Sequence, residues 1–166
     1  MSKRSTVTVR DQPAAGIMST AGALHVHGEA LTVQTDQRIE LIDLTDRVMS
    51  LVRRIPVKEG TVNVCSMHTT CAVFINESQA ALLSDIKTAL ERFVARDDAW
   101  MHNDPAHSDC DRMNADAHLR AMLLGHSLTL QINGGEVVLG QWQRILVAEL
   151  DGPRARTVRV QVMGVV

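Results

Sequence analysis

The order of its predicted elements assigns this 166-residue chain to the α+β class, with a mostly antiparallel sheet and two or three helices. Some segments alternate between apolar and polar residues, whereas others repeat apolar residues at helical spacing, so strands and helices are both expected. The elements run as strands, a helix, two strands, two helices and a final series of strands. Such segregation is typical of α+β proteins, and the length suits one domain with a substantial core.

The first half of the chain predicts four strands and two helices. Apolar, branched or alternating residues predict strands at 24–35, 39–44, 61–67 and 71–75. Between the second and third strands, a helix is expected from Thr45, with an apolar stripe that ends before Pro56. The longest helix is expected over residues 77–95, where apolar side chains recur at helical spacing.

The second half begins with a polar segment and ends in strands. Residues 96–111 lack periodicity, and a loop of this length in a compact domain is often functional. A helix is predicted over residues 112–124, and Gly125 ends it. The remaining strands are expected to form an antiparallel meander with a turn at Asn133-Gly134-Gly135, and they lie at 127–132, 137–139, 143–150 and 157–165.

Composition argues against several classes of protein. The net charge of −2, the absence of a Lys/Arg run and an aromatic content of 2% disfavour nucleic-acid binding. No apolar stretch approaches the roughly 20 residues of a membrane span. Three cysteines without a C-x-x-C pair disfavour a disulfide framework and predict a cytoplasmic location. Residues 1–23 contain Ser, Thr, Gly and Pro, and predict a poorly ordered tail before a single domain at 24–166.

A first candidate site combines a strand end with a helix start. His68-Thr69-Thr70 follows a predicted strand, and Asn76-Glu77 begins the longest predicted helix. Free N–H groups at a helix start favour an anion, and two hydroxyls beside a histidine add donors. The alternative is that the threonines are ordinary strand residues and that Asn76 only caps the helix.

Two further candidates lie in the polar segment and in the helix after it. The polar segment carries side chains that are either functional or simply exposed on a loop, namely His102, Asn103, Asp104, His107 and Asp109. Asn114 and His118 are four residues apart, so they lie on one helical face. Imidazole is the commonest transition-metal ligand, although the spacing of these histidines matches no established zinc motif. The alternative is a histidine of the core or the surface.

The fourth candidate is the C-terminal turn at Asp151-Gly152-Pro153. Arg154 and Arg156 follow it, and guanidinium groups bind phosphate or carboxylate with paired donors. The alternative is an exposed turn whose arginines are solvated or paired with Glu149. Cys65 precedes the first candidate site and suggests a Cys–His nucleophile, against the simpler interpretation of a small buried residue.

These motifs together resemble the YjbQ family, and the resemblance covers residues from about 24 to 166. The motifs are specific when they occur in this order, which is His68-Thr69-Thr70-Cys71-Ala72, Asn76-Glu77, Asp85, Asn114-Ala115-Asp116-Ala117-His118-Leu119, Gly125-His126-Ser127, Gly135, Leu139-Gly140-Gln141-Trp142-Gln143 and Asp151-Gly152-Pro153-Arg154-Ala155-Arg156. Two departures are Gln141, where the family pattern usually has Thr, and the long segment 102–111, which many members shorten.

The resemblance implies an α+β subunit that assembles as a homotrimer, with a site near subunit boundaries for a metal ion or an anion such as phosphate. Some members of that family are described as secondary thiamine-phosphate synthases, so the expected partner is a phosphorylated small molecule. The implied metal ligands are His68, His102 and His118, with zinc as the expected ion. The resemblance also places Glu77, Asn114, Arg154 and Arg156 near these histidines. Taken together with the candidate sites above, the predicted catalytic residues are His68, His118 and Glu77, and the predicted ligand-binding residues are Thr69, Thr70, Asn76, Asn114, Arg154 and Arg156. The alternative is a non-enzymatic trimer that binds a metal or a phosphorylated ligand.

Overall fold

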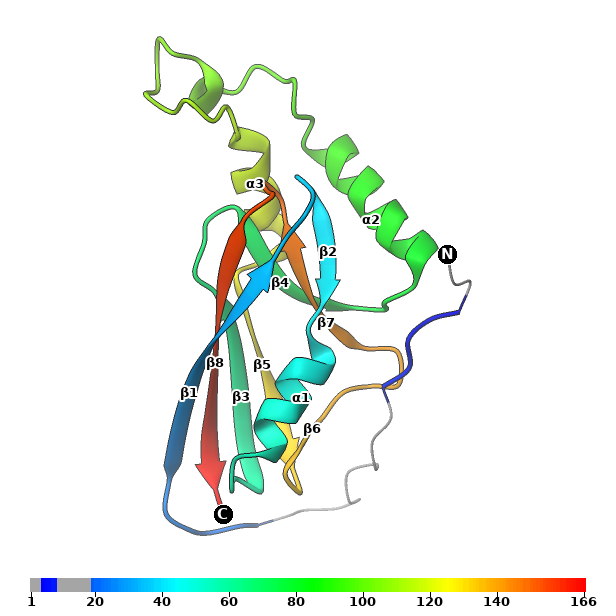
Figure 1. Cartoon of the computed structure of the whole chain (residues 1–166), viewed down its shortest axis with the longest axis vertical. Coiled ribbons are helices and arrows are strands. Elements are labelled where there is room, and N and C mark those ends of the chain that lie inside the picture. The colour runs from blue at the N-terminus through cyan, green and yellow to red at the C-terminus, as the bar shows by residue number, and fades with distance from the viewer. Residues whose placement is uncertain (1–3, 9–18) are drawn as a thin grey trace.

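The computed structural model of this chain describes residues 4–8 and 19–166. Within these ranges the chain forms eight strands, three α-helices and one 3-10 turn (Figure 1). In chain order they are β1 (His25–Gln34), β2 (Glu40–Asp43), α1 (Thr45–Arg53), β3 (Glu59–Ser66), β4 (Cys71–Asn76), α2 (Ala80–Phe93), η1 (Met101–Asn103), α3 (Ala115–Leu124), β5 (Ser127–Asn133), β6 (Glu136–Val137), β7 (Arg144–Glu149) and β8 (Ala155–Val165). The predicted α+β class with antiparallel strands is confirmed.

The larger sheet has the strand order β1-β8-β3-β5-β6, and its paired strands are antiparallel. Its strands alternate between buried and exposed residues, because only one face meets the core. Along β8, Val158, Val160 and Val162 are buried, whereas Arg159 and Gln161 lie on the exposed face. Helix α1 packs on the buried face through the apolar stripe predicted from its sequence, and this contact forms the main core.

The smaller sheet has the strand order β2-β7-β4, and its central strand is covered on both faces. All six residues of β7 are buried. Ile145 and Val147 join the main core, whereas Ala148 packs in a second cluster with Ala117 and Ala121 of α3. The predicted meander of the last strands is therefore wrong, because β7 pairs with β2 and β4 while β8 pairs with β1 and β3. An apolar run without alternation indicates a strand that is covered on both faces. A meander with one face open to solvent would leave half of the β7 side chains exposed.

The β5–β6 turn and the start of α2 follow from local chemistry. Gly134 and Gly135 form the predicted turn with φ values of 62° and 81°, which glycine adopts without strain. Helix α2 begins at Ala80, three residues later than predicted, because the Gln79 side chain caps it by accepting a hydrogen bond from Leu82 N–H.

Helices α2 and α3 are joined by the long polar loop predicted from the sequence, at the end of the molecule farthest from the C-terminus (Figure 1). Helix α3 begins at Ala115, three residues later than predicted. The Asn103 side chain accepts a hydrogen bond from Ala115 N–H, so the loop folds back on the start of this helix. Arg120 is 1% exposed and donates to the Val94 carbonyl at the end of α2. It also pairs with Asp116, so the two helices are fixed to each other.

Residues 4–8 run beside the β4–α2 connection and the loop before β7. Thr6 forms an antiparallel bridge with Ser78. Thr8 donates its N–H to the Gln141 carbonyl. Most of the predicted N-terminal tail lies outside the described ranges, so its order stays a prediction.

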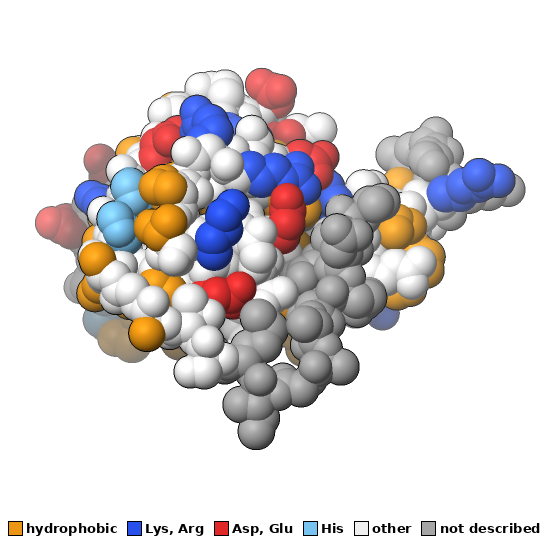
Figure 2. Space-filling view, turned by 90° about the horizontal axis from the view of Figure 1, so that it is seen from below, with side chains coloured by type: hydrophobic (Ala, Val, Ile, Leu, Met, Phe, Trp, Pro, Cys, Tyr) orange, Lys and Arg blue, Asp and Glu red, His pale blue; other side chains and the backbone are white. Residues whose placement is uncertain are grey.

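The surface carries charges of both signs, as expected for a chain with 17 Lys and Arg residues and 19 Asp and Glu residues. Seen from the end that bears the C-terminus, acidic and basic side chains are interspersed among hydrophobic ones (Figure 2). Among the described residues, no helix has the length and apolar character needed to cross a membrane. The three cysteines are free thiols.

Candidate functional site

One pocket collects most of the predicted site residues. It has a volume of about 400 Å³ and lies where the β3–β4 turn, the α2–α3 loop with α3, the β7–β8 turn and the start of β8 meet. It is lined by Met67, His68, Thr69, Thr70, His102, Cys110, Arg112, Asn114, His118, Asp151, Arg154 and Arg156. A larger hollow of about 540 Å³ lies along residues 96–104, and its lining includes none of these residues.

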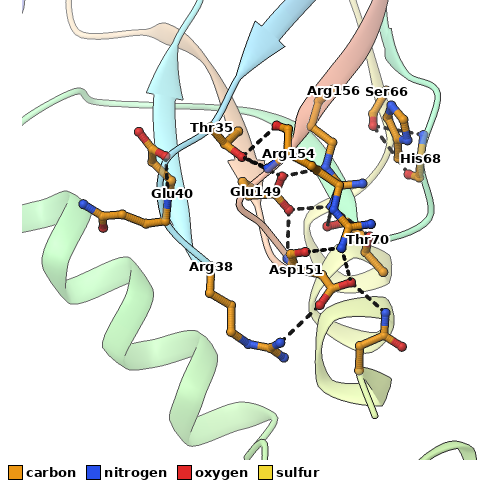
Figure 3. Close-up of polar contacts among 12 residues, drawn as sticks. Thr35, Arg38, Glu40, Ser66, His68, Thr70, Glu149, Asp151, Arg154 and Arg156 are labelled. Carbon is orange, nitrogen blue, oxygen red and sulfur yellow. Dashed lines mark hydrogen bonds and ion pairs between the residues drawn. The ribbon is translucent and has the colours of Figure 1, made fainter. Parts of the chain in front are cut away.

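The Asp151 carboxylate, in the β7–β8 turn, is the centre of the polar wall (Figure 3). It is 2% exposed and accepts hydrogen bonds from Arg38 at 3.1 Å, Arg112 at 2.8 Å, Asn114 at 2.9 Å and Arg154 at 3.0 Å. A carboxylate offers about four acceptor positions, so these donors leave Asp151 little capacity to take a proton from a substrate. Its role is to hold donors from four separate segments in place.

A second buried carboxylate, that of Glu149, lies two residues before Asp151. It accepts from Arg156 Nε at 2.6 Å and from Asp151 N–H at 2.8 Å. Arg156 is 2% exposed and also donates to Thr70 Oγ1 at 2.9 Å, which ties the β3–β4 turn to β8 (Figure 3). A Cβ at Gly152 would come within 2.7 Å of Glu149 Cγ, so the turn needs glycine there. The alternative in which an arginine pairs with Glu149 therefore holds for Arg156, in a buried rather than an exposed setting.

The ion pairs around these carboxylates leave an excess of positive charge. The network joins five arginines to three carboxylates, an excess of two positive charges, and its members are Arg38, Arg112, Arg120, Arg154 and Arg156 with Asp116, Glu149 and Asp151. The side chains of Arg112 and Arg154 are 54% and 31% exposed. Each contacts Asp151 through part of its guanidinium group. Because a guanidinium carries five N–H donors, each keeps donors that are open to the pocket, and the pocket is suited to an anion.

His68 stands on the pocket wall with one ring nitrogen already engaged. Thr157 N–H donates to His68 Nε2 at 2.8 Å, and Met67 N–H donates to the Thr157 carbonyl, so the turn is fixed to β8. The main-chain N–H of His68 donates to Ser66 Oγ at 3.3 Å (Figure 3). Burial, followed by the charge of Arg156, lowers the pKa of His68 below its ordinary value of 6.5. The imidazole is therefore neutral near pH 7.

His102 and His118 contact each other with nearly perpendicular rings, and their centroids are 5.1 Å apart. Two imidazoles on one tetrahedral zinc ion have centroids roughly 5 Å apart, given zinc–nitrogen bonds of about 2 Å. The separation of this pair is therefore compatible with a shared ion. Burial, followed by the charge of His102, lowers the pKa of His118 below its ordinary value of 6.5.

The three histidines that the family resemblance implies as metal ligands are only partly arranged for that role. In the part of the chain that the structure describes, no group of three or more His, Cys, Asp or Glu side chains is arranged to hold a metal ion. His68 Nε2 accepts a main-chain hydrogen bond, and the same lone pair cannot coordinate a metal at the same time. Zinc binding by His68, His102 and His118 therefore stays a prediction, which a measurement of metal content would test.

The structure brings eight of the ten predicted site residues to the pocket, namely His68, Thr69, Thr70, His102, Asn114, His118, Arg154 and Arg156. Asn76 and Glu77 lie at the far end of β4, roughly 20 Å from Thr70 by the rise of an extended strand. The Asn76 side chain accepts from Glu77 N–H, and the Glu77 carboxylate contacts the Ser5 hydroxyl. Among the described residues, no contact supports the predicted roles of this pair in ligand binding and catalysis.

Sequence reasoning does not find Arg112 and Asp151 as members of the site. The sequence predicts Asp151 only as a turn residue and places Arg112 in the first turn of a helix. A signal exists for Asp151, because it directly follows a buried strand and precedes two arginines. Cys65 is not in the pocket lining, and its Sγ lies 3.5 Å from the Ser66 carbonyl oxygen.

The chain matches known proteins over most of its length. A family model described as "UPF0047 protein YjbQ-like" matches residues 29–165. A UPF0047 protein of Methanothermobacter thermautotrophicus is 44% identical over 141 residues, which are 85% of this chain and 94% of that relative. A UPF0047 protein of Archaeoglobus fulgidus is 42% identical over 135 residues, which are 80% of this chain and 98% of that relative.

Solved structures show the same fold. A YbjQ-like protein of unknown function from Sulfolobus solfataricus superimposes with a TM-score of 0.80 at 34% identity, covering 86% of this chain and 99% of that one. A hypothetical protein from Aeropyrum pernix superimposes with a TM-score of 0.77 at 34% identity, covering 83% of this chain and 98% of that one. Both likenesses extend over nearly the whole of each solved chain.

Replacement of Asp151 by Asn is expected to destabilise the protein strongly, because three guanidinium groups lose a buried carboxylate. Removal of one partner from a buried ion pair costs about 3–5 kcal/mol, so the free energy of unfolding in urea should fall by about that amount. Asp104→Asn is the matched control, since its carboxylate is 49% exposed and pairs with His107, and it should cost at most about 1 kcal/mol. Equal losses in the two variants would contradict the role assigned to Asp151.

Proposed function

We propose, from the premise that this chain belongs to the UPF0047 YjbQ-like family, that its pocket binds the phosphate group of a small molecule and acts on that molecule. One observation carries the proposal, namely that the partly exposed guanidinium groups of Arg112 and Arg154 are held by the buried Asp151 carboxylate. Guanidinium groups bind phosphate through paired, charge-assisted hydrogen bonds. The Thr69 side chain on the pocket wall adds a hydroxyl donor.

Volume and charge also suit a phosphorylated small molecule. A pocket of about 400 Å³ lies in the range of small-molecule sites. The ion-pair network has an excess of two positive charges. A phosphate monoester carries about −1.5 to −2 at pH 7, so its charge complements that of the network.

The proposed reaction is a transfer on such a molecule, and thiamine-phosphate synthesis is the case that the family resemblance names. In that reaction a pyrimidine pyrophosphate joins a thiazole phosphate, so that a C–N bond forms while a C–O bond breaks and pyrophosphate leaves with the electron pair. Arg112 and Arg154 would stabilise the charge on the leaving pyrophosphate. His118 is the candidate acid or base, because imidazole titrates near neutrality and this one lines the pocket.

A second candidate function is binding without catalysis, as a trimer that holds a phosphorylated ligand or a metal ion. The saturation of Asp151 by four side-chain donors favours this alternative, because it removes one carboxylate from proton transfer. The two candidates share the phosphate site and differ in whether a bond is made.

Phosphate binding is expected to weaken when Arg112 is replaced by Gln. The lost hydrogen bond joins two charged groups and is worth about 1.5 kcal/mol or more, so calorimetric titration with inorganic phosphate should show about tenfold weaker affinity. Arg53→Gln is the matched control, because Arg53 is 50% exposed and pairs with Glu136 outside the pocket. Equal affinity in wild type and Arg112→Gln would count against the phosphate site.

Growth without thiamine tests the proposed reaction. A strain that lacks its dedicated thiamine-phosphate synthase should grow when this protein is overexpressed, and His118→Ala should abolish the rescue. Glu77→Ala should preserve it, because Glu77 lies at the far end of β4 from the pocket. If the folded wild-type protein gives no rescue but binds phosphate, the binding candidate stands and thiamine chemistry is rejected.

Assembly as a homotrimer is the proposed state in solution. It is supported by apolar side chains exposed on α2 and α3, since Phe93 is 78%, Met122 64% and Leu123 57% exposed. Sedimentation at micromolar concentration should give three times the mass of the chain, and Phe93→Glu should lower that mass. A monomer mass for the wild-type protein would refute the trimer.

A further inference from the structure

His68 has its acceptor nitrogen turned toward the protein. The main-chain N–H of Thr157 donates to His68 Nε2 at 2.8 Å. An amide N–H can donate only to a ring nitrogen that bears a lone pair, so Nε2 is unprotonated. In a neutral imidazole the proton must then sit on Nδ1. The main chain at the start of β8 thus selects one tautomer of this side chain.

The other ring nitrogen of His68 is open to solvent. Within the described residues, the hydrogen bond to the His68 ring is made at Nε2 and none is made at Nδ1. Nδ1 is also not among the buried side-chain atoms without a partner, which are His27 Nε2, Arg38 Nε and His126 Nε2, so it is exposed. The His68 side chain is partly buried, and it lines the pocket together with Arg154. Its Nδ1–H group therefore adds a donor on the side of the ring that Thr157 does not occupy.

The surroundings of the ring also keep it from gaining a second proton. Protonation at Nε2 would place an N–H group against the Thr157 N–H group, which is a donor facing a donor. Across the pocket wall, the titratable side chains of His102, Cys110 and His118 and the charged side chains of Arg112, Asp151 and Arg154 face the same space.

We propose that His68 serves the pocket as a neutral hydrogen-bond donor through Nδ1–H, and that it is neither a metal ligand nor a general base. The inference rests on the proposed function, because the acceptor for this donor is a phosphate oxygen. His68 thereby positions the ligand between the β3–β4 turn and the arginines held by Asp151. A base or a metal ligand needs a free lone pair, and the lone pair of this ring is engaged by the main chain.

The tautomer can be measured without any ligand. Long-range proton–nitrogen correlation spectra of the full-length protein distinguish protonated from unprotonated ring nitrogens for each of its seven histidines. The His68 signals are identified by their loss in His68→Gln. At pH 8 we expect a protonated Nδ1 and an unprotonated Nε2, and addition of Zn²⁺ should leave both unchanged. A protonated Nε2, or the signature of a metal-bound His68, would overturn the inference.

Two substitutions separate the donor from the acceptor of the ring. The amide of His68→Gln lies near the position of Nε2, so it can accept from Thr157 N–H but offers no donor at Nδ1. The amide of His68→Asn lies near the position of Nδ1, so it keeps a donor for the ligand but loses the bond to Thr157. His107→Gln is the control for the loss of an imidazole, because His107 is half exposed and lies outside the pocket lining.

Inorganic phosphate is the probe for these variants. We expect His68→Gln to retain its midpoint of urea unfolding but to bind phosphate about tenfold to a hundredfold more weakly, as the loss of a hydrogen bond to an anion predicts. His68→Asn should show the reverse, with a lower midpoint and affinity within a few fold of wild type. The opposite order of affinities would refute the role of Nδ1. Failure of the wild-type protein to bind phosphate would reject the proposed function, whereas the ligand-free spectrum would still decide the tautomer.

Discussion

The pairing of two buried carboxylates with arginines at the β7–β8 turn is the constraint on which the site depends. A charge buried without partners is very costly, so each carboxylate must be surrounded by donors. Glu149 recruits the start of β8 through Arg156, and Asp151 recruits the α2–α3 loop through Arg112 and the start of α3 through Asn114. Arg38 before β2 also donates to Asp151, and Arg156 donates to Thr70 in the β3–β4 turn. Four regions that are distant in sequence therefore meet at one place, and the pocket lies beside them.

Such a network is a weak source of stability. Apolar residues in place of a buried ion pair are often neutral or stabilising, and the valine-rich core against the larger sheet already provides extensive burial. The network is better explained by what it positions. Arg112 and Arg154 are held in place by Asp151, and donors that are ordered in this way lower the cost of binding a ligand.

The sequence predicts the elements of this fold better than it predicts their partners. Local apolar periodicity places every strand and α-helix boundary within three residues of its observed position. Strand order is not local, since β7 pairs with β2 and β4 rather than with its neighbours in sequence, and its two faces are covered by the main core and by α3. The same limit applies to the site. His68, His118 and Arg154 belong to recognisable motifs. The ion pair between Arg112 and Asp151 joins positions 39 residues apart, so no local sequence pattern predicts it.

The electrostatics of this network also bear on the choice between an anion and a metal ion. A divalent cation would join a network that already has an excess of two positive charges, and like charges repel strongly where water is partly excluded. Asp151 and Glu149 cannot offset that repulsion, because their oxygens are occupied by arginines and main-chain N–H groups. The spacing of His102 and His118 suits zinc, but their surroundings favour negative charge. On the charge of the network alone, an anion is therefore a better match for this pocket than a metal ion.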